Sequence, residues 1–132
     1  MSSTDLEVQH RDSVTVMRLN RPSKRNALSD RLVLAIQSAF LNLPDSTRAV
    51  VIDGAGEHFC AGLDLSEIRE RDAVEGMHHS RMWHKALNEV EQGRVPVVAA
   101  LHGAVVGGGL ELASSCHIRV ADSTAFYALP EG

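Results

Sequence analysis

The chain has 132 residues, of which 44% are hydrophobic and 23% charged, an ordinary composition for a globular domain with one hydrophobic core. Its formal net charge of −4 and its scattered basic residues argue against nucleic acid as a partner. No segment has the pattern of a membrane span or a secretory signal, and Cys60 and Cys116 are too far apart in sequence for a CxxC pair. We therefore expect a reduced, cytoplasmic protein of one domain with no membrane association.

The first part of the chain predicts a hairpin followed by a helix. Leu6–Gln9 and Val14–Leu19 are short β-favouring runs separated by a turn. Apolar residues then recur at helical spacing between Leu32 and Leu43, with Ser29 as the N-cap. This stretch is therefore expected to form an amphipathic helix.

Strands and helices alternate through the rest of the sequence. Ala49–Asp53 and Val97–Leu101 are nearly continuous apolar runs, which predicts strands buried on both faces. The remaining predicted elements are a helix from about Asp64–Ser66 to Gln92 with an irregularity at Gly76, a short helix over Gly108–Ser115 and a strand over Ile118–Ala121. This order predicts a layered α/β fold with parallel strands.

Two glycine-rich turns follow the predicted buried strands. His102–Leu112 (HGAVVGGGLEL) leads directly into a helix that carries Glu111 in its first turn, and His58–Leu65 (HFCAGLDL) follows the earlier strand. Glycine lets the backbone approach a ligand closely, and the start of a helix offers unpaired N–H groups with partial positive charge. The two turns are therefore candidates for binding one developing negative charge.

Nucleotide binding is the first alternative for such turns, and the residues exclude its usual motifs. A GxGxxG fingerprint beginning at Gly54 would need glycine where Phe59 stands, and no GK[ST] follows the glycines near Gly103. A tight strand-to-helix turn at Gly107–Gly109 that binds no ligand remains open as an interpretation.

Four sequence blocks together resemble the enoyl-CoA hydratase/isomerase, or crotonase, superfamily. The blocks are Asn20–Leu28 (NRPSKRNAL), His58–Leu65 (HFCAGLDL), His102–Ala121 (HGAVVGGGLELASSCHIRVA) and Phe126–Gly132 (FYALPEG). The resemblance implies an α/β crotonase-like ββα spiral with parallel sheet layers, in which residues 1–132 form an acyl-CoA-binding core. The family's later spiral turns and C-terminal helices have no counterpart in this sequence, so we expect the fold to continue beyond position 132.

The resemblance also implies roles for four residues. The backbone N–H groups of Leu63 and Gly108 match the family's oxyanion hole for a thioester, and Glu111 and Glu131 match the two glutamates of its hydratases. Addition of water to a 2-enoyl-CoA needs one group to take a proton from water and another to deliver one to the α-carbon. Having both glutamates therefore favours an enoyl-CoA hydratase.

Two other functions stay open. Related isomerases use a single carboxylate at the position of Glu131, and a non-catalytic crotonase-like subunit would bind acyl-CoA or a partner chain. In the isomerase, Glu111 would be a structural residue near the positive end of a helix dipole. From the residues alone, without the resemblance, Glu131 is better interpreted as a solvated loop acid.

The family's substrate contacts can be placed on further positions. Lys24, Arg25 and Ala27 match residues that contact coenzyme A, while Ala61, Asp64 and Leu65 flank the oxyanion residue and the pantetheine tunnel. A solvated basic turn is the alternative for Lys24, and capping of the following helix is the alternative for Asp64. The resemblance implies a homotrimer or dimer of trimers and no cofactor, coenzyme A being part of the substrate.

The histidines do not predict a metal site. His78, His79 and His84 share one predicted helix but lack the HExxH arrangement, so we interpret them as a surface face. His117 stands where the family usually has aspartate, a departure that leaves its hydrogen bonding open.

Overall fold

A computed structural model describes residues 5–64 and 73–130 of the chain. The described strands form one five-stranded sheet with the order β1-β2-β3-β4-β6 and one two-stranded sheet, β5-β7. The strands are β1 (Leu6–Arg11), β2 (Val14–Leu19), β3 (Ala49–Gly54), β4 (Val97–Leu101), β5 (Ala104–Val106), β6 (Ile118–Ala121) and β7 (Phe126–Ala128). The helices are the 3-10 turn η1 (Pro22–Lys24) and the α-helices α1 (Asp30–Leu41), α2 (Ala73–Gln92) and α3 (Gly108–Ser115).

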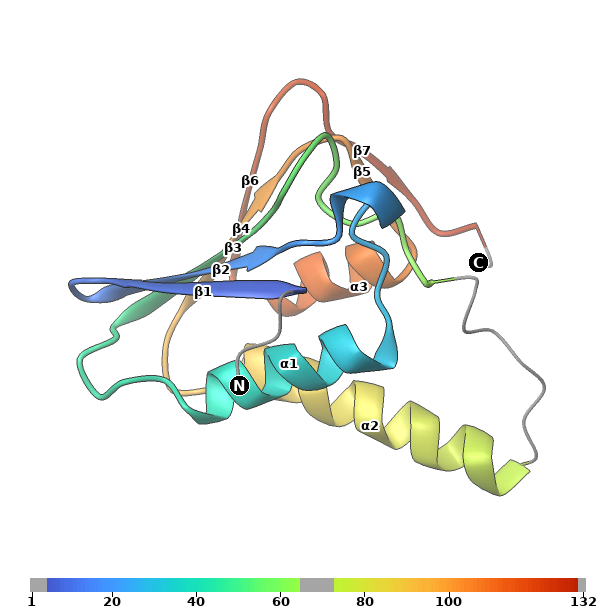
Figure 1. Ribbon diagram of the computed structural model, residues 1–132, viewed down its shortest axis with the longest axis horizontal. Helices are drawn as coiled ribbons and strands as arrows, with labels where there is room; N and C mark the ends of the chain where they lie inside the picture. Colours follow the sequence, from blue (N-terminus) through green and yellow to red (C-terminus); the bar gives the residue numbers. More distant parts are fainter. Residues whose placement is uncertain (1–4, 65–72, 131–132) are drawn as a thin grey trace.

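The sheet topology confirms the predicted α/β fold. β1 and β2 form the antiparallel hairpin, and β2, β3, β4 and β6 then pair in parallel. Among the described elements, α1, α2 and α3 all lie on one side of the large sheet (Figure 1). Parallel pairing brings the carboxyl ends of β3, β4 and β6 to one end of the sheet, where the glycine-rich turns begin.

The predicted burial of two strands on both faces is wrong. Burial alternates along β3 and β4: Val50, Ile52, Val97 and Ala99 are fully buried, whereas their neighbours along each strand are half-buried. These buried side chains share one hydrophobic core with buried side chains of α1, α2 and α3, and the described residues place no helix over the other face of the sheet (Figure 1). The apolar composition of these strands does not by itself reveal that a second covering layer is missing from this part of the fold.

The first helix is confirmed with its cap. The side chain of Ser29 accepts a hydrogen bond from the backbone N–H of Leu32 at 3.1 Å, as expected of an N-cap residue. The buried face of α1 is formed by Leu32, Val33, Ile36 and Phe40.

The second helix differs from its prediction at one point. α2 runs without interruption through Gly76 to Gln92, so the expected irregularity at Gly76 is wrong. A glycine raises the free energy of a helix by only about 1 kcal/mol and does not have to break it. The expected start near Asp64–Ser66 lies outside the described residues except for Asp64.

Two strands were not anticipated from the sequence. β5 and β7 are three residues long, too short for a periodic pattern, and they pair in parallel although α3 and β6 lie between them in the sequence. Their pairing fixes the backbone on both sides of the glycine turn before α3, because the Gly107 N–H donates to the Ala128 carbonyl oxygen at 2.8 Å.

Candidate functional site

The turn that begins at His58 lies between Leu28 and β5. The Leu28 N–H donates to the Gly62 carbonyl at 2.7 Å, and the Asp64 N–H donates to the Leu28 carbonyl at 3.1 Å. On the other side, the Cys60 N–H donates to the Ala104 carbonyl at 3.0 Å. Segments from three distant parts of the sequence are therefore held side by side by backbone hydrogen bonds.

Leu63 occupies the position in this pairing where the backbone groups face away from Leu28. In this parallel bridge Leu28 makes its two hydrogen bonds with Gly62 and Asp64, the neighbours of Leu63. The N–H and carbonyl of Leu63 itself therefore point away from Leu28. Within residues 5–64 and 73–130, the Leu63 N–H has no hydrogen-bond acceptor. The preceding Gly62 has a φ of 112°, a conformation that favours glycine, and a Cβ there would lie 3.3 Å from the Val106 carbonyl oxygen.

Gly108 supplies the second candidate donor. It is the first residue of α3, where backbone N–H groups have no partner inside the helix, and it is buried. Its N–H has no acceptor in the described part of the chain. A Cβ on Gly108 would lie 3.3 Å from Leu28 Cδ1 and 3.4 Å from Trp83 Cζ3. Leu28 therefore contacts both donor regions, through its backbone at Leu63 and through its side chain at Gly108.

Glu111 lies one turn into α3, where its backbone N–H donates to the Gly107 carbonyl at 3.0 Å. Its side chain is exposed to solvent, so the described residues do not provide the dehydrated surroundings expected of a catalytic carboxylate. Two further predicted site residues, Glu131 and Leu65, lie outside the described residues. Their roles stay predictions.

The predicted coenzyme A contacts lie on the η1 turn and the residues after it. Lys24 and Arg25 are exposed, and Arg25 has a φ of 53° and a carbonyl that accepts the Ala61 N–H at 3.0 Å. Ala27 is buried, its N–H donates to the Lys24 carbonyl at 3.0 Å, and its own carbonyl accepts from Arg21. The Ala27 backbone therefore keeps only the remaining lone pair of that carbonyl for a further hydrogen bond.

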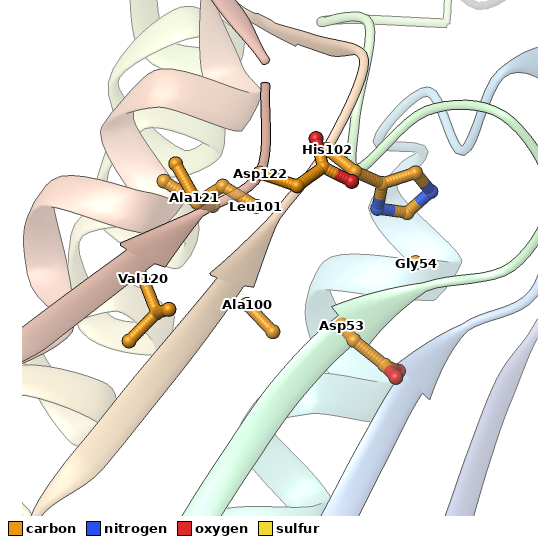
Figure 2. Close-up of a pocket in the computed structure, with 8 residues that line it drawn as sticks. All are labelled: Asp53, Gly54, Ala100, Leu101, His102, Val120, Ala121 and Asp122. Carbon is orange, nitrogen blue, oxygen red and sulfur yellow. The ribbon is translucent and has the colours of Figure 1, made fainter. Parts of the chain in front are cut away.

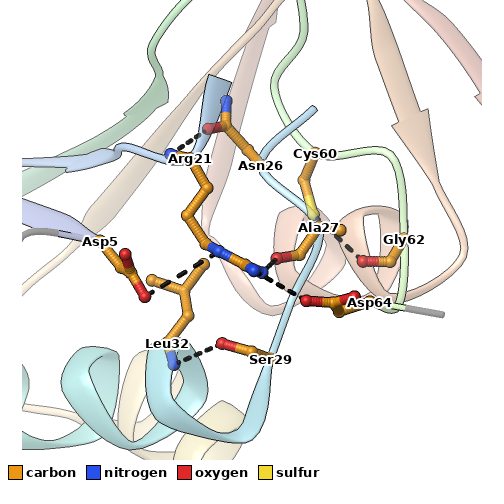
Figure 3. Close-up of polar contacts among 9 residues, drawn as sticks. All are labelled: Asp5, Arg21, Asn26, Ala27, Ser29, Leu32, Cys60, Gly62 and Asp64. Atoms are coloured by element: carbon orange, nitrogen blue, oxygen red, sulfur yellow. Dashed lines mark hydrogen bonds and ion pairs between the residues drawn. The ribbon is translucent and has the colours of Figure 1, made fainter. Parts of the chain in front are cut away.

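Arg21 and Asp64 form an ion pair that the sequence did not predict (Figure 3). Arg21 Nη2 lies 2.7 Å from Asp64 Oδ2, and the two side chains are only 15% and 7% exposed. Arg21 Nη1 also donates to the Ala27 carbonyl, and Asp5 lies 3.9 Å from Arg21 Nε. The carboxylate of Asp64 is therefore bound by a nearly buried guanidinium, a partner additional to any helix-capping role.

Asn26 is the second unpredicted polar residue of this region. It is fully buried with a φ of 58°, and its Oδ1 accepts the Arg21 N–H at 2.7 Å. Its Nδ2 donates to the Ala55 and His58 carbonyls at 2.9 and 2.8 Å. An asparagine beside basic residues in a turn gives no sequence signal for such burial, apart from its tolerance of a left-handed conformation.

A separate hollow of about 310 Å³ lies at the carboxyl ends of β3, β4 and β6 (Figure 2). Its lining residues are Asp53, Gly54, Ala100, Leu101, His102, Val120, Ala121 and Asp122. The polar side chains among them are already engaged, since Asp53 pairs with Arg18 at 2.9 Å and His102 Nε2 lies 2.8 Å from the Gly56 carbonyl oxygen. Hydrogen bonds from Thr124 lower the pKa of Asp122. None of the predicted site residues lines this hollow.

The histidines have mainly structural partners. His79 Nε2 lies 2.8 Å from Asp30 Oδ1, so this residue joins α2 to α1 and is only half-buried, whereas His78 and His84 are exposed as expected. The described residues contain no cluster of histidine, cysteine and acidic side chains that could hold a metal ion. Among these same residues no helix is both long and apolar enough to span a membrane.

His117, which replaces the family's usual aspartate, connects α2 to β4. The Val97 N–H donates to His117 Nδ1 at 2.8 Å, so Nδ1 carries no proton. The proton lies on Nε2, which donates to the Glu91 carbonyl at 2.8 Å. This ring therefore makes two backbone hydrogen bonds with one fixed tautomer.

Comparison with known proteins places the chain in one family. A model of the enoyl-CoA hydratase/isomerase family matches residues 9–132. A short-chain enoyl-CoA hydratase of Clostridium acetobutylicum is 34% identical over 99% of the chain and 51% of its own length. A peroxisomal Δ3,5-Δ2,4-dienoyl-CoA isomerase of Arabidopsis thaliana is also 34% identical, over 90% of the chain and 48% of its own length.

The fold agrees with this result. The crystal structure of a candidate enoyl-CoA hydratase from Rhodopseudomonas palustris superimposes with a TM-score of 0.94 and 57% sequence identity, covering 96% of this chain and 49% of that one. The chain thus spans about half the length of the relatives that it matches. By its sequence from residue 9 onward and by its crotonase-like α/β fold, the chain belongs to the enoyl-CoA hydratase/isomerase family.

Proposed function

We propose that the protein adds water to a 2-enoyl-CoA thioester. The observation that carries this proposal is the pair of backbone N–H groups at Leu63 and Gly108, two residues that both neighbour Leu28 and whose N–H groups have no acceptor within the described residues. During hydration the thioester carbonyl oxygen gains negative charge, and donors already in place stabilise that charge more than they stabilise the neutral carbonyl. Loss of one such donor typically costs about 3 kcal/mol in the activation free energy.

The two glutamates would move the protons in this proposal. One carboxylate takes a proton from water while the water oxygen bonds to the β-carbon. The other carboxyl group delivers a proton to the α-carbon of the enolate. Glu111 and Glu131 are the candidates for these roles. The position of Glu111 in the first turn of α3, three residues after Gly108, supports its assignment.

The proposed substrate contacts follow from the same part of the structure. Exposed Lys24 and Arg25 would bind the phosphates of coenzyme A, and Ala27, Ala61, Asp64 and Leu65 would flank the pantetheine arm. Coenzyme A enters as part of the substrate, and no resident cofactor is proposed. We further propose a cytoplasmic homotrimer or dimer of trimers.

An enoyl-CoA isomerase is the second candidate, because two observations favour it. Glu111 is exposed in the described structure, and the isomerase relative is as similar to the chain as the hydratase relative. In an isomerase, Glu131 alone would carry the proton between two carbons of the acyl chain. Glu111 would then stabilise only the start of α3, by at most about 1 kcal/mol.

Substitution of Glu111 separates these candidates. The natively expressed protein is assayed for loss of 2-butenoyl-CoA on hydration and for migration of the double bond in a 3-enoyl-CoA. Glu111→Gln should reduce hydration at least a hundredfold, while Glu91→Gln, which changes another exposed helix glutamate, should leave it unchanged. Near-full hydration together with double-bond migration would favour the isomerase. Tight acyl-CoA binding without any turnover would favour a binding subunit.

A further inference from the structure

We infer that Arg21 is a positioning residue that holds the Leu63 amide in place through Asp64. The inference rests on the proposed function for its catalytic consequence, since it concerns the donor assigned to the thioester oxygen. Its structural basis is independent of that function: a nearly buried ion pair lies immediately beside a residue whose N–H has no acceptor in the described chain.

Apart from the hydrogen bonds of its two neighbours to Leu28, little in the described structure holds the backbone at Leu63 in place. Gly62 and Asp64 are bonded to Leu28, whereas Leu63 has a side chain that is 44% exposed and contributes little to the core. Gly62 has a φ of 112°, a region in which glycine moves freely. A peptide N–H in such a segment keeps its direction only if both neighbours are fixed.

Arg21 fixes the neighbour on the carboxyl side. Its Nη2 lies 2.7 Å from Asp64 Oδ2, and its Nη1 donates to the carbonyl of Ala27, the residue before Leu28. One guanidinium therefore joins the segment that ends at Leu28 to the segment around Leu63. The pairing of these two segments points the Leu63 N–H away from Leu28. Because the pair is only 15% and 7% exposed, solvent screens it weakly.

Asn26 fixes the other end of the same loop. Its side chain bonds to the Ala55 and His58 carbonyls and to the Arg21 backbone N–H. The segment Arg21–Leu28 thus clamps the loop between Ala55 and Asp64 at both ends. Arg21 is the only member of this clamp, within the described residues, whose side chain reaches the residue next to Leu63.

The test compares Arg21→Met with Arg18→Met in the natively expressed protein. Arg18 offers a matched control because it also forms an ion pair, 2.9 Å from Asp53 in β3, yet it is 48% exposed and its partner is not a sequence neighbour of Leu63. Asp64→Asn is the second variant, since it removes the charge and keeps the size and backbone of the residue. Partial recovery is expected in Arg21→Lys, which restores a cation but not the fork of donors.

Hydrogen exchange, kcat and the carbonyl stretch of a bound thioester are expected to change together in the two variants. In Arg21→Met and Asp64→Asn, hydrogen exchange at the Leu28 and Asp64 amides should accelerate at least tenfold, while exchange at Val50 and Ile52 in β3 stays unchanged. Turnover should fall ten- to a hundredfold in kcat in both variants, with less than a threefold change in KM in Arg21→Met. The carbonyl stretch of a bound ¹³C-labelled acyl-CoA thioester should move back toward its value in water.

The outcomes distinguish this inference from the proposed function. If the unsubstituted protein neither turns over nor polarises an acyl-CoA thioester, the proposed function fails, and unchanged exchange in the variants would then overturn the positioning role as well. If the unsubstituted protein is active and Arg21→Met behaves like Arg18→Met in kcat and in exchange, the positioning role alone is overturned. Faster exchange throughout β3 would show general destabilisation and would also overturn it.

Discussion

Gly109 packs directly against Cys60, so that a Cβ at Gly109 would overlap the Cys60 carbonyl oxygen and lie 2.8 Å from the Cys60 Cβ. The carbonyl of Cys60 is fixed there because it accepts the Val106 N–H at 3.1 Å. Helix α3 can therefore approach the first glycine-rich turn only with glycine at this position. The contact explains one of the three consecutive glycines without reference to any ligand.

This relationship predicts opposite outcomes at two adjacent glycines. Gly109→Ala should lower the free energy of unfolding by about 3 kcal/mol or more, because backbone atoms would have to move. Gly108→Ala should change it by no more than about 1 kcal/mol, because the new methyl group meets only the movable side chains of Leu28 and Trp83. Urea unfolding of both variants measures the difference, and equal losses would contradict this account of the packing.

The buried amide of Asn26 should be a major contributor to stability. Asn26→Ala would leave the Arg21 N–H and the Ala55 and His58 carbonyls without their partner, and we expect a loss of about 2–4 kcal/mol. Asn26→Asp should cost more at neutral pH, because a carboxylate oxygen would face the two carbonyl oxygens. Asn42→Ala, which removes an exposed asparagine bonded to Ser38, serves as the control in urea unfolding and should cost less than about 1 kcal/mol. Equal effects at both asparagines would be inconsistent with the clamp.

The two cysteines should make the protein sensitive to alkaline pH. Burial raises the pKa of Cys60 to about 11 and that of Cys116 to about 12, from an ordinary value of 9.0. Above about pH 9 the unfolded thiols lose protons that the folded thiols keep, so the folded state binds more protons and its stability falls as pH rises. The slope is up to about 1.4 kcal/mol per pH unit for each thiol.

Unfolding at pH 8 to 10.5 and thiol labelling check this prediction. Below pH 9 the native protein should resist iodoacetamide, whereas the urea-unfolded protein should be labelled at both cysteines. Cys60→Ala should show a shallower alkaline loss of stability. Rapid labelling of the native protein at pH 8 would show that the thiols are not shielded.

His117 should stabilise the junction of α2 and β4 by its two backbone hydrogen bonds. His117→Asp, which introduces the residue usual in the family, cannot donate to the Glu91 carbonyl, and we expect a loss of about 1–2 kcal/mol. His84→Asp, a change at an exposed histidine on α2, is the control for added charge. If His117→Asp is as stable as the unsubstituted protein, the histidine makes no net contribution at this junction.

The sequence predicted the elements whose signals are local. Ser29 has the residue type and spacing of an N-cap, and β2 and α3 have the predicted bounds. The turn His102–Leu112 stands out in the sequence because its four glycines after an apolar run are typical of a tight turn at the end of a strand, whereas His58–Leu65 contains only Gly62. Family resemblance then supplied the fold class, which the comparison with solved structures confirmed.

Features that depend on distant partners could not be predicted in the same way. The burial of β3 depends on which faces of the sheet are covered by helices. The pairing of β5 with β7 depends on chain segments that are distant in sequence and carry no periodic pattern. The Arg21–Asp64 pair joins residues 43 positions apart, and each side chain taken alone is typical of an exposed turn or a helix cap. Such pairs follow from the fold and are invisible in local composition.

The most direct test of the central claim is the response of two amide protons to a thioester. Saturated butanoyl-CoA is added to the ¹⁵N-labelled protein, and the NMR signals of the Leu63 and Gly108 amides are followed, with coenzyme A alone as the control. The account predicts that both signals move downfield together and saturate with butanoyl-CoA, whereas coenzyme A moves neither. Binding of butanoyl-CoA that leaves either amide signal in place would contradict it.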